Sequence, residues 1–286
     1  MWLTAGQTQI QARYDTHRTN RNNQQRAKLL APDFPGVTID EILARLENPS
    51  SYPGYQDPRN CLVFWARPPK HLRSLIAEVQ RRLLEVAPSL WTMPQANLHM
   101  TAMEVTHSQT AEEIDTLVEK LEPEEATISD YTFDHRARLV KPMVSYDAQA
   151  LALSLLPANG EGDRSANEDK YTYHHLRRDL FTQIQAAGVK VGSRYVIPSA
   201  HLTIGRFITK KDFETEDRKV DHAKMEKLIA TIESINAWLE DEFWPKEDGS
   251  IKTGGEWTVG EEKGLDCHQG RLWYGGGEEV VLGRGF

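Results

Sequence analysis

An α+β protein with two lobes related by pseudo-twofold symmetry is the fold class that this sequence of 286 residues predicts. The first observation is a pair of His-x-Thr segments, Asn97-Leu98-His99-Met100-Thr101 and Ser199-Ala200-His201-Leu202-Thr203, each in a short apolar run. The second is that each segment follows a stretch with helical spacing, and the first of those stretches follows a strand pattern. Two units of this order favour two lobes, although only the His-x-Thr itself repeats.

Composition indicates a globular protein, with 39% apolar and 27% charged residues. No apolar run approaches the roughly 18 residues of a membrane span, so we expect no membrane partner. The two cysteines, Cys61 and Cys267, are too few for a zinc knuckle or a disulfide framework. They favour a reducing, cytoplasmic location, with the nucleus as the alternative. The net charge of −8 argues against coating long nucleic acid but leaves room for a small phosphate ligand.

Residues 1–50 read as an N-terminal extension of a single domain that spans residues 51–286. Residues 1–30 carry five basic side chains against Asp15 alone. A transit peptide is one interpretation, but an arm that lies on the domain or stays partly mobile is favoured. A short helix is predicted over residues 39–47, with Thr38 as its N-cap.

The first regular block alternates strands and helices. After a loop rich in Pro, Gly and Ser at residues 48–58, the β-forming run at 61–66 predicts a buried strand. Apolar residues at helical spacing predict an amphipathic helix over 72–86. The first His-x-Thr strand covers about residues 97–106. A Thr-x-x-Glu capping box then opens a helix over 110–121.

Strand-forming runs continue at residues 127–134, 137–146 and 149–156. Residues 157–171 form a polar loop. An apolar stripe over 173–187 predicts a helix that ends at Gly188.

The second His-x-Thr strand covers residues 195–207, and a charged loop follows at 209–220. A long helix is expected over 225–239. The glycine-rich end of the chain predicts β-hairpins with strands at residues 256–259, 271–274 and 279–284.

Residues i and i+2 of a strand point to the same face, so His99 leaves the sheet beside Thr101, and His201 beside Thr203. If the two strands are neighbours, all four groups converge on one site. Two histidines can share the base and acid roles in phosphodiester hydrolysis, while threonine hydroxyls donate to the phosphate oxygens. These roles need no metal and no cofactor, and zinc-type spacings are absent. A single His-x-Thr is more often plain packing, but two on comparable segments favour a site.

At these residues the chain resembles the 2H phosphoesterase superfamily, named for two histidine motifs. Residues 91–101, Trp-Thr-Met-Pro-Gln-Ala-Asn-Leu-His-Met-Thr, look like its first motif, and residues 200–206, Ala-His-Leu-Thr-Ile-Gly-Arg, look like its second. Residues 63–69 are similar to the opening strand of the plant and fungal cyclic phosphodiesterase branch. Ala200 departs from the family, which often has proline before the second histidine.

The resemblance covers about residues 60–285 and implies two antiparallel sheets related by pseudo-twofold symmetry, with flanking helices and a cleft between the lobes. It also implies hydrolysis of a small 2′,3′-cyclic nucleotide or of ADP-ribose 1″,2″-cyclic phosphate. His201 is taken as the base and His99 as the acid, although the reverse remains open. We expect a monomer.

Four further residues are candidate ligand contacts. Trp65 could stack on a base or ribose, or be a core residue. Arg206 could contact phosphate, or form a salt bridge, and strict alternation places it on the face opposite His201 unless the strand carries a bulge. Tyr195 and Tyr146 could line the cleft, although packing is the favoured reading for both.

Two alternative functions stay open at this point. One is a phosphodiesterase for 2′,5′-oligonucleotides or RNA 3′ ends, which would have short RNA ends as partners. The other is a nucleotide-binding module without catalysis, which the four intact His and Thr residues disfavour.

Overall fold

The computed structural model describes residues 6–192 and 197–286, and within them the strands form one curled antiparallel sheet of nine strands. The strands are β1 (Asn60–Ala66), β2 (Leu90–Thr92), β3 (Met100–Gln109), β4 (Arg138–Tyr146), β5 (Ala150–Pro157), β6 (His201–Phe207), β7 (Glu256–Thr258), β8 (Lys263–Gly270) and β9 (Glu278–Arg284). Their order is β7-β4-β5-β6-β3-β1-β8-β9, and β2 pairs with β6 outside this path.

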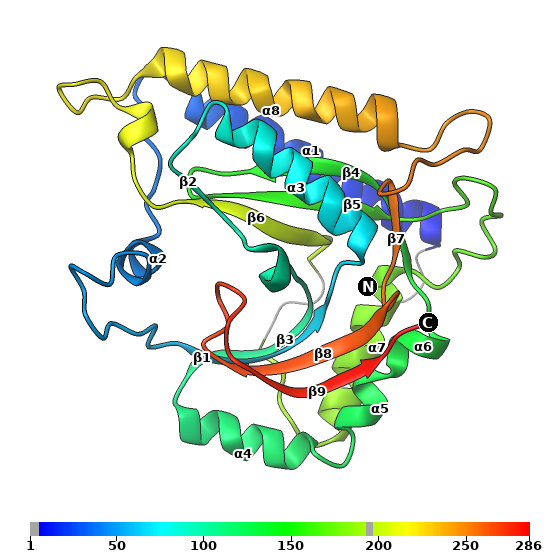
Figure 1. Ribbon diagram of the computed structural model, residues 1–286. Helices are drawn as coiled ribbons and strands as arrows, with labels where there is room; N and C mark the ends of the chain where they lie inside the picture. Colours follow the sequence, from blue (N-terminus) through cyan, green and yellow to red (C-terminus); the bar gives the residue numbers. More distant parts are fainter. Residues whose placement is uncertain (1–5, 193–196) are drawn as a thin grey trace.

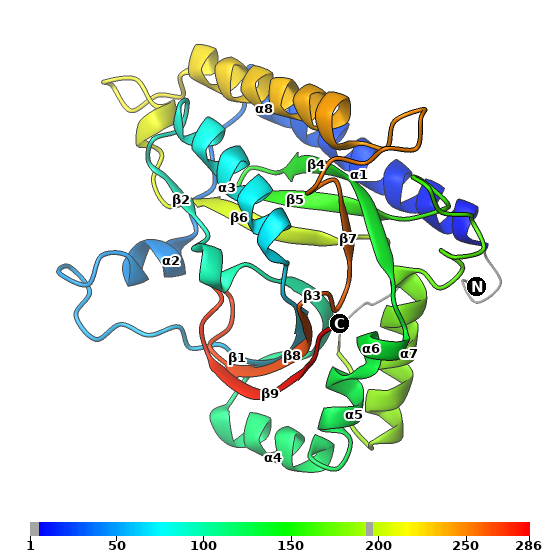
Figure 2. The same cartoon turned by 45° about the vertical axis from the view of Figure 1, so that its right-hand side comes forward.

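The helices flank this sheet on different sides. They are α1 (Gln7–Leu29), α2 (Glu41–Leu46), α3 (Lys70–Leu84), α4 (Ala111–Leu121), α5 (Glu125–Ser129), α6 (Tyr131–Asp134), α7 (Tyr173–Ala186) and α8 (His222–Phe243), with 3₁₀ turns at Gln95–Asn97 and Lys211–Phe213. Helices α3 and α8 lie beside strands β4 to β6, whereas α4 to α7 lie beside the other half of the sheet (Figure 1 and Figure 2). Across the described residues, no helix has both the length and the apolar character to cross a bilayer.

The expected α+β class is confirmed, but the expectation of two separate sheets is wrong. Strands β3 and β6 pair at Met100 and Leu202, and this pair joins the two halves into one sheet. The sheet curls where the halves meet, which is visible between β6 and β3 in Figure 1. The pseudo-twofold relation between the halves stays a prediction.

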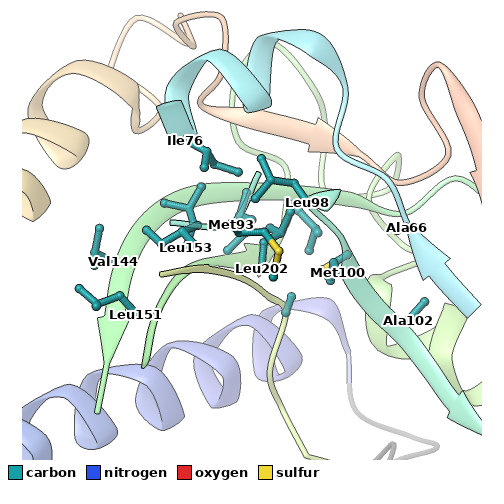
Figure 3. Packing of buried hydrophobic residues seen from close by; sticks show 14 of the residues in the cluster. Ala66, Ile76, Met93, Leu98, Met100, Ala102, Val144, Leu151, Leu153 and Leu202 are labelled. Carbon is teal, nitrogen blue, oxygen red and sulfur yellow. The ribbon is translucent and has the colours of Figure 1, made fainter. Parts of the chain in front are cut away.

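The apolar side chains of both His-x-Thr segments share one core. Leu98, Met100, Ala102 and Leu202 are each at most 1% exposed and belong to the main hydrophobic cluster. Figure 3 shows them gathered with Ile76 of α3. The alternation that buries these residues turns the intervening histidines and threonines to the opposite face.

Most of the predicted helices are confirmed, including the capping box of α4, in which Thr110 and Glu113 satisfy each other's backbone. Helix α7 is followed by Gly188 with φ 80°, as a C′ glycine requires. The N-cap of α2 is Asp40 rather than Thr38, since the Asp40 carboxylate accepts from the Leu43 backbone N–H at 3.2 Å. Its side chain thereby also becomes available to the site described below.

The strand expected over residues 127–134 is wrong, because helices α5 and α6 occupy it. Thr, Ile, Tyr and Phe favoured a strand there, but Ile128, Ser129 and Thr132 are buried at helical spacing. Packing of α5 on β8 and β9 outweighs the residue propensities.

The strand expected over residues 271–274 is also wrong. These residues lie in the turn between β8 and β9, where Gly275 and Gly277 have positive φ. Strand β8 precedes that turn, and Gly264 and Asp266 within it mask the usual strand pattern.

Helix α1 forms from the polar segment that showed only weak periodicity. Its buried stripe is narrow and includes a charged residue, since Ile10, Tyr14 and Arg18 are each at most 4% exposed. Arg18 donates from Nη1 to the Lys141 carbonyl of β4 at 2.7 Å. The helix therefore lies on β4 and β5, below those strands in Figure 3.

The part of β4 that extends beyond its pairing with β7 has an open edge, which a side chain of α8 covers. Asn236 Oδ1 accepts from the Val144 N–H at 2.7 Å, and its Nδ2 donates to the Val144 carbonyl at 3.0 Å. One amide thus satisfies both backbone groups of an edge residue, which protects the edge from further strand pairing.

Gly283 of β9 provides a test of how tightly α5 packs on the sheet. A Cβ at this position would overlap the backbone carbonyl of Ser129, which cannot move independently of its helix. We expect Gly283→Ala to lower the free energy of unfolding by about 1–3 kcal/mol in urea denaturation. Gly6→Ala is the control, because nothing lies within 4 Å of its added methyl. Equal stability of Gly283→Ala and wild type would contradict this packing.

Candidate active site

The pairing of β3 with β6 brings the two His-x-Thr segments together. Met100 of β3 is the partner of Leu202 of β6 in an antiparallel register. Continuing that register by one residue in each direction sets His99 opposite Thr203 and Thr101 opposite His201. All four side chains line one cavity of about 170 Å³ on the polar face of the sheet. The predicted convergence of these four groups is therefore present in the structure.

Each histidine has its Nδ1 engaged by the residue two positions earlier. His99 Nδ1 lies 2.7 Å from the Asn97 carbonyl, so Nδ1 carries the hydrogen and donates it. His201 Nδ1 lies 2.9 Å from the Ser199 hydroxyl, which can donate or accept. The Nε2 atom of each ring is then the nitrogen left for chemistry. The matching positions of Asn97 and Ser199 were visible in the sequence as a signal that the prediction did not use.

Burial in the cleft disfavours the charged form of both imidazoles. It lowers the pKa of His99 to about 4, aided by the charge of the nearby Arg67, while the Asn97 carbonyl opposes the shift. It also lowers the pKa of His201 to about 4, aided by the charges of Arg177 and Arg21. The His201 side chain is exposed to water, which screens part of this shift. Both histidines are therefore neutral near pH 7, and an anion in the cleft would favour their protonation.

Arg206 reaches the same face as the histidines through a β-bulge. Leu151 of β5 pairs with Gly205 and Ala152 pairs with Thr203, so Ile204 is the extra residue on β6. This resolves the alternation problem noted in the sequence, and Arg206 lines the cleft.

The guanidinium of Arg206 is also held by an ion pair. Its Nη1 lies 3.1 Å from Asp40 Oδ2, while the Tyr274 hydroxyl donates to Asp40 Oδ1 at 2.6 Å. The two readings of Arg206, ligand contact and salt bridge, are thus compatible.

Trp65 lies in the cleft wall but is only 1% exposed. Its ring stacks on His99, with centroids 4.1 Å apart, and on His268 at 4.7 Å. Behind it, Asp266 joins His268 at 2.8 Å and Arg67 at 2.7 Å. The ring surface expected to meet a ligand is instead largely taken by these contacts, which orient His99.

Of the two tyrosines predicted as ligand contacts, Tyr146 does not line the cleft that holds the four central groups. Tyr146 is 6% exposed and lines a neighbouring cavity rather than the cleft. Burial and the charge of Glu233 raise its pKa to about 12, so its phenol stays protonated. Tyr195 lies outside the described residues.

Trp273 and Glu104 are among the cleft side chains that sequence reasoning missed. Trp273, in the turn between β8 and β9, is 37% exposed and lines the cleft, with the Arg59 guanidinium 4.2 Å from its ring centroid. Glu104 of β3 also lines it, and burial raises its pKa. The expected strand at residues 271–274 concealed Trp273, since turn geometry is what presents its ring.

Arg177 of α7 ties the two histidine segments together from outside the cleft. Its Nε donates to the Ala102 carbonyl at 3.3 Å and its Nη1 to the Ile197 carbonyl at 2.7 Å. A single planar side chain thus fixes the strand after His99 to the segment before His201.

Within residues 6–192 and 197–286, the cleft included, no group of three His, Cys, Asp or Glu is placed to hold a metal ion.

No protein-family model matches the chain, and no curated protein matches its sequence. Among solved structures, ATU0111, a conserved protein of unknown function from Agrobacterium tumefaciens, is 12% identical with a TM-score of 0.49, over 80% of this chain and 88% of that chain. TT0787 of Thermus thermophilus is 12% identical with a TM-score of 0.38, over 78% and 96%. Usb1 of Kluyveromyces marxianus with uridine monophosphate is 10% identical with a TM-score of 0.38, over 79% and 96%. All three TM-scores are below 0.5, so these similarities assign neither a family nor a function to this chain.

The lowered histidine pKa values predict a pH dependence of stability. In the unfolded chain the pKa of both rings returns to about 6.5. Between pH 6.5 and about 4 the unfolded state therefore binds more protons than the folded state. Stability therefore falls as pH falls through this window. We expect urea unfolding of His99→Gln/His201→Gln to lose less stability than wild type between about pH 7 and pH 5, by on the order of 1 kcal/mol after allowing for solvent screening. The exposed His107, changed to Gln, is the control, and an unchanged slope in the double variant would contradict the assignment.

Proposed function

We propose that this protein is a metal-independent phosphodiesterase that hydrolyses a small cyclic nucleotide phosphate, either a 2′,3′-cyclic nucleotide or ADP-ribose 1″,2″-cyclic phosphate. The observation that carries the proposal is the register of Met100 with Leu202, which gathers His99, Thr101, His201 and Thr203 in one cleft. Arg206 adds a positive charge beside them. The resemblance of the two motifs to 2H phosphoesterases supports the same reaction.

His201 suits the role of general base. Burial, aided by the positive charges of Arg177, Arg21 and Arg206, keeps its ring neutral. Its Nε2 takes a proton from water as the water oxygen attacks phosphorus. The hydroxyls of Thr101 and Thr203 donate to the non-bridging oxygens, where charge accumulates.

His99 suits the role of general acid. The Asn97 carbonyl accepts from Nδ1 and favours the protonated ring, which the phosphate anion also stabilises. As the P–O bond to the leaving oxygen breaks, His99 Nε2 donates its proton to that oxygen. The products are a phosphomonoester and a free hydroxyl, with His201 protonated and His99 neutral. Exchange of one proton with solvent restores the starting state.

Trp273 is the side chain best placed to meet the nucleobase. Its ring is partly exposed at the rim of the cleft, whereas Trp65 is covered. A base stacked on an aromatic ring contributes about 1–3 kcal/mol, whatever its identity.

Removal of either histidine tests the proposed reaction. We expect His99→Ala and His201→Ala each to lower kcat by on the order of 10²–10⁴-fold, because each removes one proton transfer. The assay would use 2′,3′-cyclic nucleotides, ADP-ribose cyclic phosphate and a 2′,5′-dinucleotide, with and without EDTA. His107→Ala is the matched control, since His107 is exposed and lies outside the cleft.

Three outcomes of that assay would contradict the proposal in different ways. Full activity of His99→Ala or of His201→Ala would contradict the two-histidine mechanism. Loss of activity in EDTA would indicate a metal. An inactive wild type across the whole panel would favour the nucleotide-binding module.

The separate roles of the two histidines can be tested with a 4-nitrophenyl phosphodiester. Its leaving group departs without a proton, so the general acid is no longer needed. We expect His99→Ala to retain kcat within about 10-fold of wild type on this substrate, while His201→Ala still loses on the order of 10²-fold. The opposite pattern would exchange the roles.

A further inference from the structure

A second cavity adjoins the cleft and has α1 as its other wall. It measures about 370 Å³ and shares His201, Thr203 and Arg206 with the cleft. Four residues of α1 line it: Tyr14, His17, Arg18 and Arg21. They recur at helical spacing and so belong to one face of the helix. The N-terminal segment thus forms part of a space continuous with the reacting groups.

This cavity carries more positive than negative charge, although the chain as a whole carries −8. Three arginines line it, Arg18, Arg21 and Arg206, against Asp147 as the acidic side chain in the described lining, while Asp15 and Asp40 pair with Arg18 and Arg206 from outside that lining. Arg21 pairs with Asp147 at 2.8 Å, yet half of its side chain is exposed. Because a guanidinium has five N–H donors, Arg21 can keep this pair and still bind an anion.

Size and surface also indicate more than a single scissile phosphate. The cavity has about twice the volume of the cleft beside it. The segment before His201 adds apolar surface, with Ile197 42% exposed. Ser154 and Gln149 add polar groups on the β5 side. Mixed walls of this kind suit a ribose that leads to a second charged group.

We infer that the substrate carries a second phosphate group beyond the scissile one, and that Arg21 and His17 of α1 bind it. This inference rests on the proposed function and narrows its substrate class to nucleotides with two phosphorylated positions. The second phosphate can be a terminal one on a small nucleotide or the next backbone phosphate of an oligonucleotide. Both place a second negative charge on the α1 side of His201.

Calorimetric binding of product-like nucleotides tests the subsite without relying on turnover. The probes are adenosine 2′-monophosphate and adenosine 2′,5′-bisphosphate, which differ only in the second phosphate. For wild type we expect the bisphosphate to bind on the order of 10-fold more tightly, as a charge-assisted contact to phosphate provides. Arg21→Gln should reduce this preference to about twofold or less.

Arg26→Gln provides a closely matched control. Arg26 lies on the same helix, is equally exposed at 51%, and pairs with Glu233 as Arg21 pairs with Asp147. It does not line the cavity. We expect this variant to keep the preference for the bisphosphate. If Arg26→Gln lost as much of this preference as Arg21→Gln, the effect would come from the overall positive charge of the helix, and the subsite would be overturned.

A third probe, an adenosine dinucleotide with a 2′-phosphate end, distinguishes the two sources of the second phosphate. Tighter binding of the dinucleotide than of the monophosphate supports the subsite and assigns it to a backbone phosphate. A gain with the bisphosphate alone supports it and assigns it to a small nucleotide. Equal binding of all three probes would overturn the subsite and leave the proposed function standing. No binding of any probe would overturn both.

Discussion

One backbone pairing, Met100 with Leu202, determines the rest of this structure. It joins β3 to β6 and makes one sheet from two halves. The same two side chains are at most 1% exposed in the core, where burying a side chain of this size contributes about 1.5–3 kcal/mol. A slip of β6 by one residue would turn Leu202 into the cleft and His201 into the core, and would separate His201 from His99. Packing energy therefore fixes the register, and the register fixes the site.

The site that results is electrostatically incomplete without an anion. Two imidazoles are held neutral in a confined space, with Arg206 and Arg67 close to it. Asp40 and Asp266 each hold one of these arginines and balance part of its charge. A phosphodiester would add negative charge where the histidines must become protonated. Under the proposed function, both histidines thus stay neutral until a phosphodiester binds, which suits acid–base chemistry.

The central site was predictable because its pattern is local. Strand alternation around His99 and His201 specifies both the polar and the apolar face, and the core confirms the apolar one. The bulge at Ile204 was anticipated only as a condition on Arg206, since a bulge depends on how the neighbouring strand pairs. For Trp65 the sequence left ligand stacking and core packing open for a related reason: it shows an aromatic in a strand but not the histidines that cover it.

The parts that the sequence did not reveal are those that depend on long-range packing. Helix α1 has a stripe that includes a buried arginine, so its amphipathic signal is weak and its place against β4 comes from tertiary hydrogen bonds. Trp273 lies in a turn that contains glycines with positive φ. Asp40 pairs with Arg206 although the two residues are 166 positions apart in the sequence. Under the proposed function, the reacting groups lie on regular strands, whereas the groups proposed to surround the ligand lie on α1 and on turns. Strand patterns therefore indicate the reaction, and the choice of substrate depends on elements whose positions no local pattern specifies.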